Sequence, residues 1–392
     1  MKYIKITFFI LVILSFALYE SIEIKMVTAS QLSMDYSFST RYYIFFLTLS
    51  TGFFSIFHKN IRNGFSGILA LLIAYILCIS LFYGFNSVTF SGTLSHVAEI
   101  IMPLFVFYYF FQIAHIIEHR LVLIGIVIVY AFIVYAFIES YQLRVLLANT
   151  EYVRVGEVYS LFFLLPIFLM TKNKVVKIVS VIVVSIAMLF AMKRGGMVSL
   201  AIGLLLYFIV NSIYETGKVQ HKNVLSMLFV MVVLYFIVTF FMEDTLNNAM
   251  ERMNSIGVDE GSDRVPVYET TWRMIINSDG LSVIFGHGWN MVLKNSPLGY
   301  SAHNDFMECL YDFGMIGACF YLFFFFKLYK SMFILIRFRS EMAAPFAFSV
   351  VTFTINSMIS HVLIYPFNMI CFTAVWGYLL GKIKEQLILR MI

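Results

Sequence analysis

Residues 121–140 read LVLIGIVIVYAFIVYAFIES, a run in which Glu139 is the only charged side chain. A helix of about 20 mostly apolar residues is long enough to cross the hydrocarbon core of a bilayer. Apolar runs in soluble proteins are usually shorter than this, so the stretch predicts a membrane-spanning helix.

The same character extends over the whole chain. Of its 392 residues, 61% are hydrophobic and 12% are charged, whereas soluble domains typically have about 45–50% apolar and about 25% charged residues. The sequence therefore predicts an all-α, polytopic membrane protein of about twelve transmembrane helices. Together with 121–140, the expected spans are 3–19 (retained, not cleaved as a signal peptide), 41–57, 64–83, 97–114, 156–170, 174–192, 196–213, 224–242, 304–326, 343–362 and 366–381, and residues 327–341 extend or tilt their neighbour.

The basic residues orient these helices. With a cytoplasmic N-terminus, 17 of the 27 lysines and arginines fall in loops on the cytoplasmic side, as the positive-inside rule requires. Both termini are then cytoplasmic, and the long loop 243–302 lies outside. The expected division is residues 1–242 with nine helices, the loop 243–302, and residues 303–392 with three helices. Short amphipathic helices are expected in the loop at 243–254 and 265–276, around a polar turn at 257–263.

Composition and motifs exclude several classes of protein. The net charge of +5 comes from basic residues that lie mostly in the predicted cytoplasmic loops, so we expect the lipid bilayer and not nucleic acid as the partner. The four cysteines have no metal-ligand spacing, and we expect neither a metal site nor a cofactor. The sequence also lacks the zinc-protease, P-loop and serine-hydrolase motifs.

Two adjacent basic residues lie on the outer side of the membrane, where the positive-inside rule disfavours them. Lys193 and Arg194 precede two glycines at the outer junction of the seventh and eighth spans. A guanidinium fork matches phosphate oxygens, and glycine permits close backbone approach, so the pair suggests an anion site. The alternative is an anchor for lipid headgroups. Arg264 in the long loop is a further candidate cation, or an ordinary surface residue.

The stretch Ser301-Ala-His-Asn-Asp305 marks the return of the chain to the membrane. Ser301 or Asn304 is expected to cap the following helix. His303 then lies at the membrane face, where an imidazole can act as acid, base or hydrogen-bond donor; a histidine merely satisfied at the interface is the alternative. Asp305, Glu308 and Asp312 share one helical side, and intramembrane acids usually face a functional cavity.

Further candidates for substrate binding are Arg144 and Arg154, which flank the outer loop 141–155, and His361, which ends the eleventh span. For the two arginines the alternative is simple ion pairing with Glu151 or Glu157. Asn304 is also a candidate for substrate binding.

These motifs, taken in order, resemble the O-antigen polymerase and O-antigen ligase superfamily. Phe285-Gly-His-Gly-Trp289 and the His303-Asn304 pair fit a long outer loop that ends in a "GxG … HN" pattern, and ten residues separate His303 from Gly314. Arg194-Gly195 is similar to the family's Arg-Gly motif, although Val198 replaces a frequent leucine. Arg264 corresponds to a further arginine early in the loop.

The resemblance implies a GT-C-like bundle in the bacterial inner membrane that transfers glycans at the periplasmic face without a metal. The donor would be an undecaprenyl-diphosphate-linked glycan, and a chain-length regulator protein is an implied partner. His303, Arg194, Arg264 and Glu308 would be catalytic: the arginines neutralise the departing diphosphate and His303 deprotonates or positions the acceptor hydroxyl, with Glu308 as orienting group or alternative base. Lys193, Arg144, Arg154, Asn304 and His361 would bind substrate.

The wording of the motifs favours a polymerase of repeat units for O-antigen or a similar surface polysaccharide. The first alternative is an O-antigen ligase, which transfers the polymer to the lipid A core of lipopolysaccharide. The second is a polytopic transporter or lipid flippase. A transporter should place its polar residues near the membrane midplane, often with internal repeats, whereas the polar residues of this chain cluster at the outer face.

Overall fold

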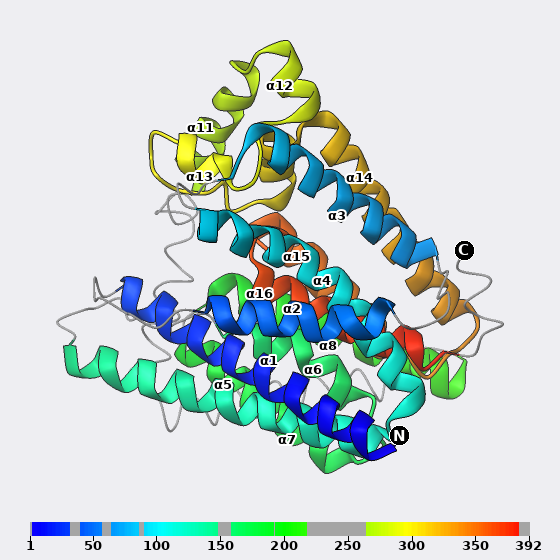
Figure 1. Cartoon of the computed structure of the whole chain (residues 1–392). Coiled ribbons are helices and arrows are strands. Elements are labelled where there is room, and N and C mark those ends of the chain that lie inside the picture. Colours follow the sequence, from blue (N-terminus) through cyan, green and yellow to red (C-terminus); the bar gives the residue numbers. More distant parts are fainter. Residues whose placement is uncertain are drawn as a thin grey trace.

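A computed structural model describes residues 2–31, 40–56, 64–85, 90–147, 158–191, 193–217 and 264–383. All regular elements in these ranges are helices (Figure 1). They are α1 (Lys2–Gln31), α2 (Arg41–Ile56), α3 (Gly64–Tyr83), α4 (Phe90–Ile116), α5 (His119–Leu147), α6 (Tyr159–Leu169), α7 (Lys174–Phe190), α8 (Arg194–Thr216), α11 (Arg264–Ile276), α12 (Gly280–Phe285), α13 (Met291–Asn295), α14 (Asp305–Arg337), α15 (Ala343–Ile359) and α16 (Pro366–Gly381).

Each predicted span that the structure describes lies on a helix. Eleven of the twelve apolar runs lie on a helix, and the remaining run, 224–242, lies outside the described residues. Within the described ranges, six helices are long and apolar enough to cross a membrane: α1, α3, α4, α5, α8 and α14. The multi-pass, all-helical class is therefore confirmed, while twelve crossings, the GT-C-like arrangement and the orientation of the termini stay predictions.

Several of the described helices extend beyond their predicted spans, among them α1, α4 and α5. α1 continues past residue 19 because its polar side chains find partners inside the bundle: Glu20 accepts a hydrogen bond from Ser160 and lies 3.5 Å from the Cys371 sulfur. α14 has a kink at Gly314, where the backbone is non-helical, and then continues to Arg337, an extension that agrees with the expectation for residues 327–341. On this extension the Lys327 ammonium lies 5.6 Å from the centre of the Phe323 ring, a cation–π contact.

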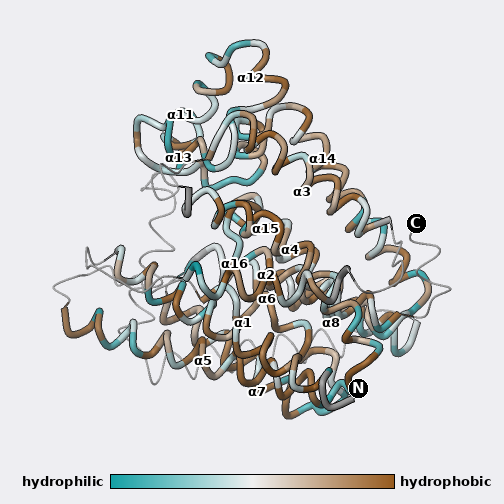
Figure 2. The backbone as a smooth tube through the Cα atoms, viewed as in Figure 1, coloured by the Kyte–Doolittle hydropathy of each residue, from teal (hydrophilic) through white to brown (hydrophobic). Residues whose placement is uncertain are grey.

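The core of the bundle is aromatic. Phe353 and Trp376 pack with ring centroids 5.0 Å apart, and Phe324 and Phe65 each lie within 5.8 Å of the Trp376 ring. Figure 2 shows the matching pattern of hydropathy, with apolar residues along the helices and hydrophilic residues at their ends and in the connections. Interlocking rings of this kind hold helices together where lipid offers no hydrophobic driving force.

The short helices α11, α12 and α13 gather at one end of the molecule, over the end of α3 and the start of α14 (Figure 1). α11 covers the predicted amphipathic helix at 265–276, while the predicted helix at 243–254 and the turn at 257–263 lie outside the described residues. The stretch 285–300 contains the single turn of helix α13. The division of the chain at residues 242 and 302 stays a prediction.

Candidate functional site

His303 stands immediately before α14, in a left-handed backbone conformation with φ of 52°. Asn304 then begins the helix: its side-chain oxygen accepts hydrogen bonds from the Phe306 and Met307 amides at 3.0 and 3.2 Å. Its amide nitrogen donates to the Met358 carbonyl at 3.1 Å. Asn304 is therefore the cap of α14, as one of the two expected candidates, and it also ties this helix to the end of α15.

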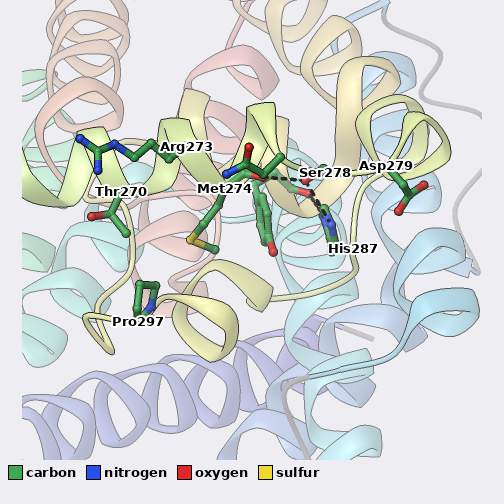
Figure 3. Close-up of a pocket in the computed structure, with 9 residues that line it drawn as sticks. Thr270, Arg273, Met274, Ser278, Asp279, His287 and Pro297 are labelled. Carbon is green, nitrogen blue, oxygen red and sulfur yellow. Dashed lines mark hydrogen bonds between the residues drawn. The ribbon is translucent and has the colours of Figure 1, made fainter.

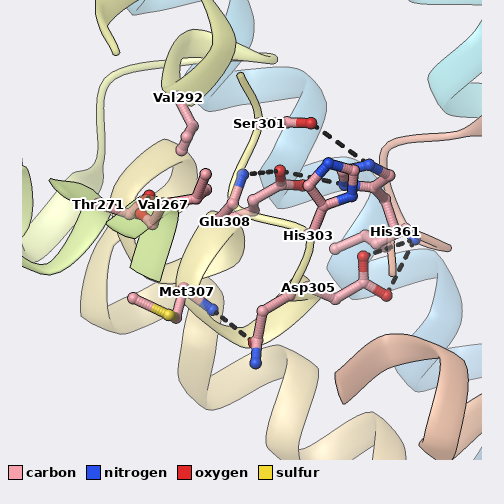
Figure 4. Close-up of polar contacts among 12 residues, drawn as sticks. Val267, Thr271, Val292, Ser301, His303, Asp305, Met307, Glu308 and His361 are labelled. Atoms are coloured by element: carbon pink, nitrogen blue, oxygen red, sulfur yellow. Dashed lines mark hydrogen bonds and ion pairs between the residues drawn. The ribbon is translucent and has the colours of Figure 1, made fainter. Parts of the chain in front are cut away.

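The predicted residues His303, Glu308 and His361 meet in one cluster (Figure 4). The two imidazole rings pack with centroids 4.3 Å apart. Glu308 Oε1 lies 3.3 Å from His361 Nδ1 and accepts a hydrogen bond from the Ala302 amide at 2.7 Å. Ser301 Oγ lies 3.3 Å from His361 Nε2. His361 is buried with both ring nitrogens next to polar atoms, whereas His303 is only half-buried.

Asp305 holds the backbone that directly follows His361. Its carboxylate accepts hydrogen bonds from the Val362 and Leu363 amides at 2.9 and 3.2 Å, and from the Tyr321 hydroxyl at 2.9 Å. The side chain is fully buried, and buried acceptors of this kind need such partners. Asp305 thus holds the turn after α15 against α14. This structural role was not predicted from the sequence, which indicated a functional cavity beside Asp305.

Arg264 reaches the neighbourhood through α11. It is the first residue of that helix, one turn before Tyr268, whose hydroxyl lies 3.5 Å from the His303 carbonyl oxygen. Burial raises the pKa of Tyr268, with Arg264 acting in the opposite direction, so the phenol stays protonated and can donate. The loop therefore brings the helix that begins with Arg264 to the backbone of His303.

The Lys193-Arg194 pair arrives on a third element. α8 begins beside the end of α15, so close that a Cβ on Gly195 would lie 2.6 Å from the Ile359 side chain. Four residues further on, Ser199 Oγ accepts a hydrogen bond from the Asn356 amide at 2.8 Å. The Lys193 ammonium lies 5.9 Å from the centre of the Tyr159 ring. The side chain of Arg194 is outside the described residues, but its helix start adjoins the chain leading to His361.

The two remaining arginines are placed differently. Arg144 is buried in the last turn of α5, whose Tyr141 packs on Phe190 at the end of α7 with ring centroids 5.3 Å apart. That contact places the last turn of α5 beside the end of α7, close to the α7–α8 junction. Arg154 lies outside the described residues. Substrate binding by either arginine stays a prediction.

The glycines of the predicted signature make a direct contact between two backbones. Gly286 and Gly314 both have positive φ, at 91° and 66°. A Cβ on Gly286 would lie 2.2 Å from the Asp312 carbonyl oxygen, and one on Gly314 would lie 2.4 Å from the Ile284 carbonyl oxygen. Only glycine fits either position. The spacing from His303 to Gly314 therefore measures the distance along α14 from the candidate site to the docking point of the loop.

Asp312 completes this contact. Its carbonyl accepts hydrogen bonds from the His287 and Gly288 amides at 3.0 and 2.8 Å, and its carboxylate accepts one from the Val292 amide at 2.9 Å. Like Asp305, it holds a returning loop, while the functional cavity expected beside these acids stays a prediction. In the sequence, acidic residues close to a glycine-rich loop, whose backbone amides need hydrogen-bond acceptors, could have indicated this role.

The described residues contain no group of three or more histidine, cysteine, aspartate or glutamate side chains placed to hold a metal ion. The cluster instead offers an imidazole fixed by a second imidazole and a carboxylate. Such an arrangement suits proton transfer. Arginine-bearing helices on two sides suit stabilisation of an anion.

Comparison with known proteins agrees with this arrangement. Residues 179–322 match a family model described as O-antigen ligase. This segment of the chain is similar to the O-antigen ligase family. The segment extends from α7 to α14 and includes Arg194, Arg264 and His303, so the resemblance to the superfamily is confirmed. It indicates a glycosyl-transferring membrane protein of the O-antigen ligase or polymerase kind. No curated protein matches the chain.

Asn304 allows a test of its structural role. Replacing it with alanine removes the cap of α14 and is expected to lower the free energy of unfolding by about 1 kcal/mol. Asn304→Ser keeps an oxygen acceptor for the Phe306 and Met307 amides, and should retain most of the stability. The melting temperature of the purified protein in detergent measures both. Equal melting temperatures for the two variants would contradict the capping role, while substrate binding by Asn304 stays a prediction.

Proposed function

We propose that this protein polymerises oligosaccharide repeat units linked to undecaprenyl diphosphate, at the periplasmic face of the bacterial inner membrane. One observation carries the proposal: three signature positions, far apart in sequence, belong to elements that meet at one end of α14. His303 precedes α14, and the Tyr268 hydroxyl, on the helix that begins with Arg264, lies 3.5 Å from its carbonyl oxygen. The helix that starts at Arg194 adjoins the end of α15.

The proposed chemistry uses these residues in three roles. His303 accepts the proton of an acceptor sugar hydroxyl as its oxygen forms a bond to the anomeric carbon of the donor. The bond from that carbon to the diphosphate breaks, and the leaving group takes the electron pair. Arg194 and Arg264 neutralise the charge that develops on the diphosphate. No metal is required for any of these steps.

His361 and Glu308 are positioning residues in this scheme. The Glu308 carboxylate beside His361 Nδ1 stabilises a positive charge on that ring. Because the His361 ring packs on His303, it restrains the orientation of the half-buried imidazole. Orientation of a base by a second group is a recurrent feature of proton-transfer sites.

The ligase activity remains the second candidate, because the matching family model is described as O-antigen ligase. The two activities use the same donor and differ in the acceptor, which is another lipid-linked repeat unit for a polymerase and the lipid A core for a ligase. The site geometry is compatible with both. The wording of the sequence motifs, Lys193-Arg-Gly-Gly196 and His303-Asn-Asp-Phe-Met-Glu308, resembles polymerases more than ligases.

Deletion of the gene in the bacterium that encodes it separates the candidates. Under the proposal, the deletion strain makes a surface lipid that carries a single repeat unit, and a plasmid copy restores long chains. Uncapped core together with accumulated lipid-linked polymer would instead identify a ligase. Normal chain length on normal core would contradict both activities. Gel electrophoresis of the surface lipids and mass spectrometry of the extracted undecaprenyl lipids give the result.

A further inference from the structure

A polar cavity lies between the end of α11 and the loop that carries His287 and Pro297, outside the His303 cluster (Figure 3). Its volume is about 670 Å³, within the range of about 300–1,000 Å³ typical of small-molecule sites. The end of α11, the turn before α12 and the glycine-rich loop form its walls. Most of the lining side chains carry hydrogen-bonding groups, among them Thr270, Arg273, Asn277, Ser278 and His287.

The orientation of His287 is fixed by its surroundings. Nδ1 lies 2.9 Å from the Tyr311 carbonyl oxygen, which can only accept, so Nδ1 carries the proton. In the neutral ring Nε2 is then an acceptor, and Ser278 Oγ lies 3.4 Å from it. The ring also stacks on Tyr311, with centroids 4.0 Å apart and an angle of 11° between the planes. The cavity wall thus presents a held imidazole acceptor beside a hydroxyl group.

The charges around the cavity balance each other. Arg273 lies 3.6 Å from Glu269 on the same helix. Asp279 accepts hydrogen bonds from the Leu281 and Ser282 amides, and hydrogen bonding to Ser282 lowers its pKa, so it stays ionised as the cap of α12. A cavity with one paired cation and one engaged anion has no excess charge for a diphosphate. Its amide, hydroxyl and imidazole groups fit a neutral ligand rich in hydroxyl groups.

The cavity and the candidate site share α14. Tyr311, which lines the cavity, follows Glu308 by three residues, so the two side chains lie on one face of the helix. Ile275, Ala302 and Met291 pack with Tyr311 into a small apolar cluster between them. A ligand in the cavity is therefore separated from the His303 cluster by about one helical turn and one layer of side chains.

We infer that this cavity binds the saccharide part of a lipid-linked substrate and holds it while the reacting end lies at His303. The inference rests on the proposed function and deepens it, because it assigns the recognition of the sugar to residues away from the diphosphate. Thr270 and Asn277 supply hydrogen bonds to sugar hydroxyls, and His287 Nε2 accepts one.

A kinetic test uses the full chain in lipid nanodiscs with lipid-linked repeat units extracted from the encoding bacterium. In the double variant Thr270→Ala/Asn277→Ala, KM for the repeat unit should rise about three- to tenfold for each hydrogen bond lost, with kcat unchanged. Lys294→Ala, an exposed change on α13 away from the cavity lining, is the matched control and should leave both constants unchanged.

Two results would overturn the assignment. One is an unchanged KM in the double variant, and the other is a fall in kcat alone, which indicates disturbance of the reacting groups. His303→Asn in the same assay separates this inference from the function on which it rests. If His303→Asn is inactive and the double variant has a normal KM, only the saccharide cavity is wrong. If His303→Asn retains full activity, only the role of His303 as the base is wrong; if the wild-type protein does not extend the repeat units, the proposed function itself fails.

Discussion

Replacing His303 with asparagine is expected to remove long polysaccharide chains while leaving the protein folded in the membrane. The imidazole is the proposed base, and loss of general-base catalysis typically costs about 10²–10⁴-fold in rate. Asparagine is the informative substitution because His303 has a φ of 52°. Asparagine tolerates the left-handed conformation better than most residues, so the backbone before α14 is retained.

Chain length on gels and membrane abundance on immunoblots measure this effect. His115→Ala is the matched control, since His115 is an exposed histidine at the opposite end of the bundle, in the last turn of α4. It should leave chain length unchanged. Normal chains from His303→Asn at normal abundance would rule out His303 as the base and would direct attention to Glu308.

Much of the fold could be predicted because the bilayer imposes a simple rule on sequence. A spanning helix must be apolar for about 20 residues, so runs such as 121–140 reveal themselves without knowledge of their neighbours. Helix ends were less predictable. Glu20 looks like the end of a span, yet α1 continues because Ser160 on α6 and Cys371 on α16 satisfy its carboxylate. That partner choice depends on tertiary packing, which a local reading does not contain.

The candidate site divides in the same way. His303 and the arginine motifs could be predicted, because charges on the disfavoured side of a membrane need a reason. The meeting of His361 with His303 could not, since it depends on Asp305 holding the Val362 and Leu363 amides. His287 was likewise missed. Its position inside a glycine motif marked it as part of a turn, and only the fold shows its ring stacked on Tyr311.

Replacing Gly314 with alanine is expected to displace the glycine-rich loop from α14 and to destabilise the protein strongly. Gly314 lies at the kink of α14 with φ 66° and ψ −172°, a backbone region almost restricted to glycine. Forcing another residue into such a region costs about 1–3 kcal/mol. The new Cβ would also lie 2.4 Å from the Ile284 carbonyl oxygen and 2.6 Å from the Gly286 nitrogen, so one backbone must move.

The movement has a functional consequence, which distinguishes it from simple loss of packing. The amides of His287 and Gly288 would lose their bonds to the Asp312 carbonyl, and the wall of the saccharide cavity would shift with them. We therefore expect a lower melting temperature together with weaker substrate binding. Gly67→Ala is the matched control: Gly67 lies inside α3 with open space around its Cα, where alanine typically stabilises a helix by about 0.4–1 kcal/mol. If Gly314→Ala melts like the wild-type protein, the backbone contact between Gly286 and Gly314 does not hold the loop, and the positioning assigned to Asp312 fails with it.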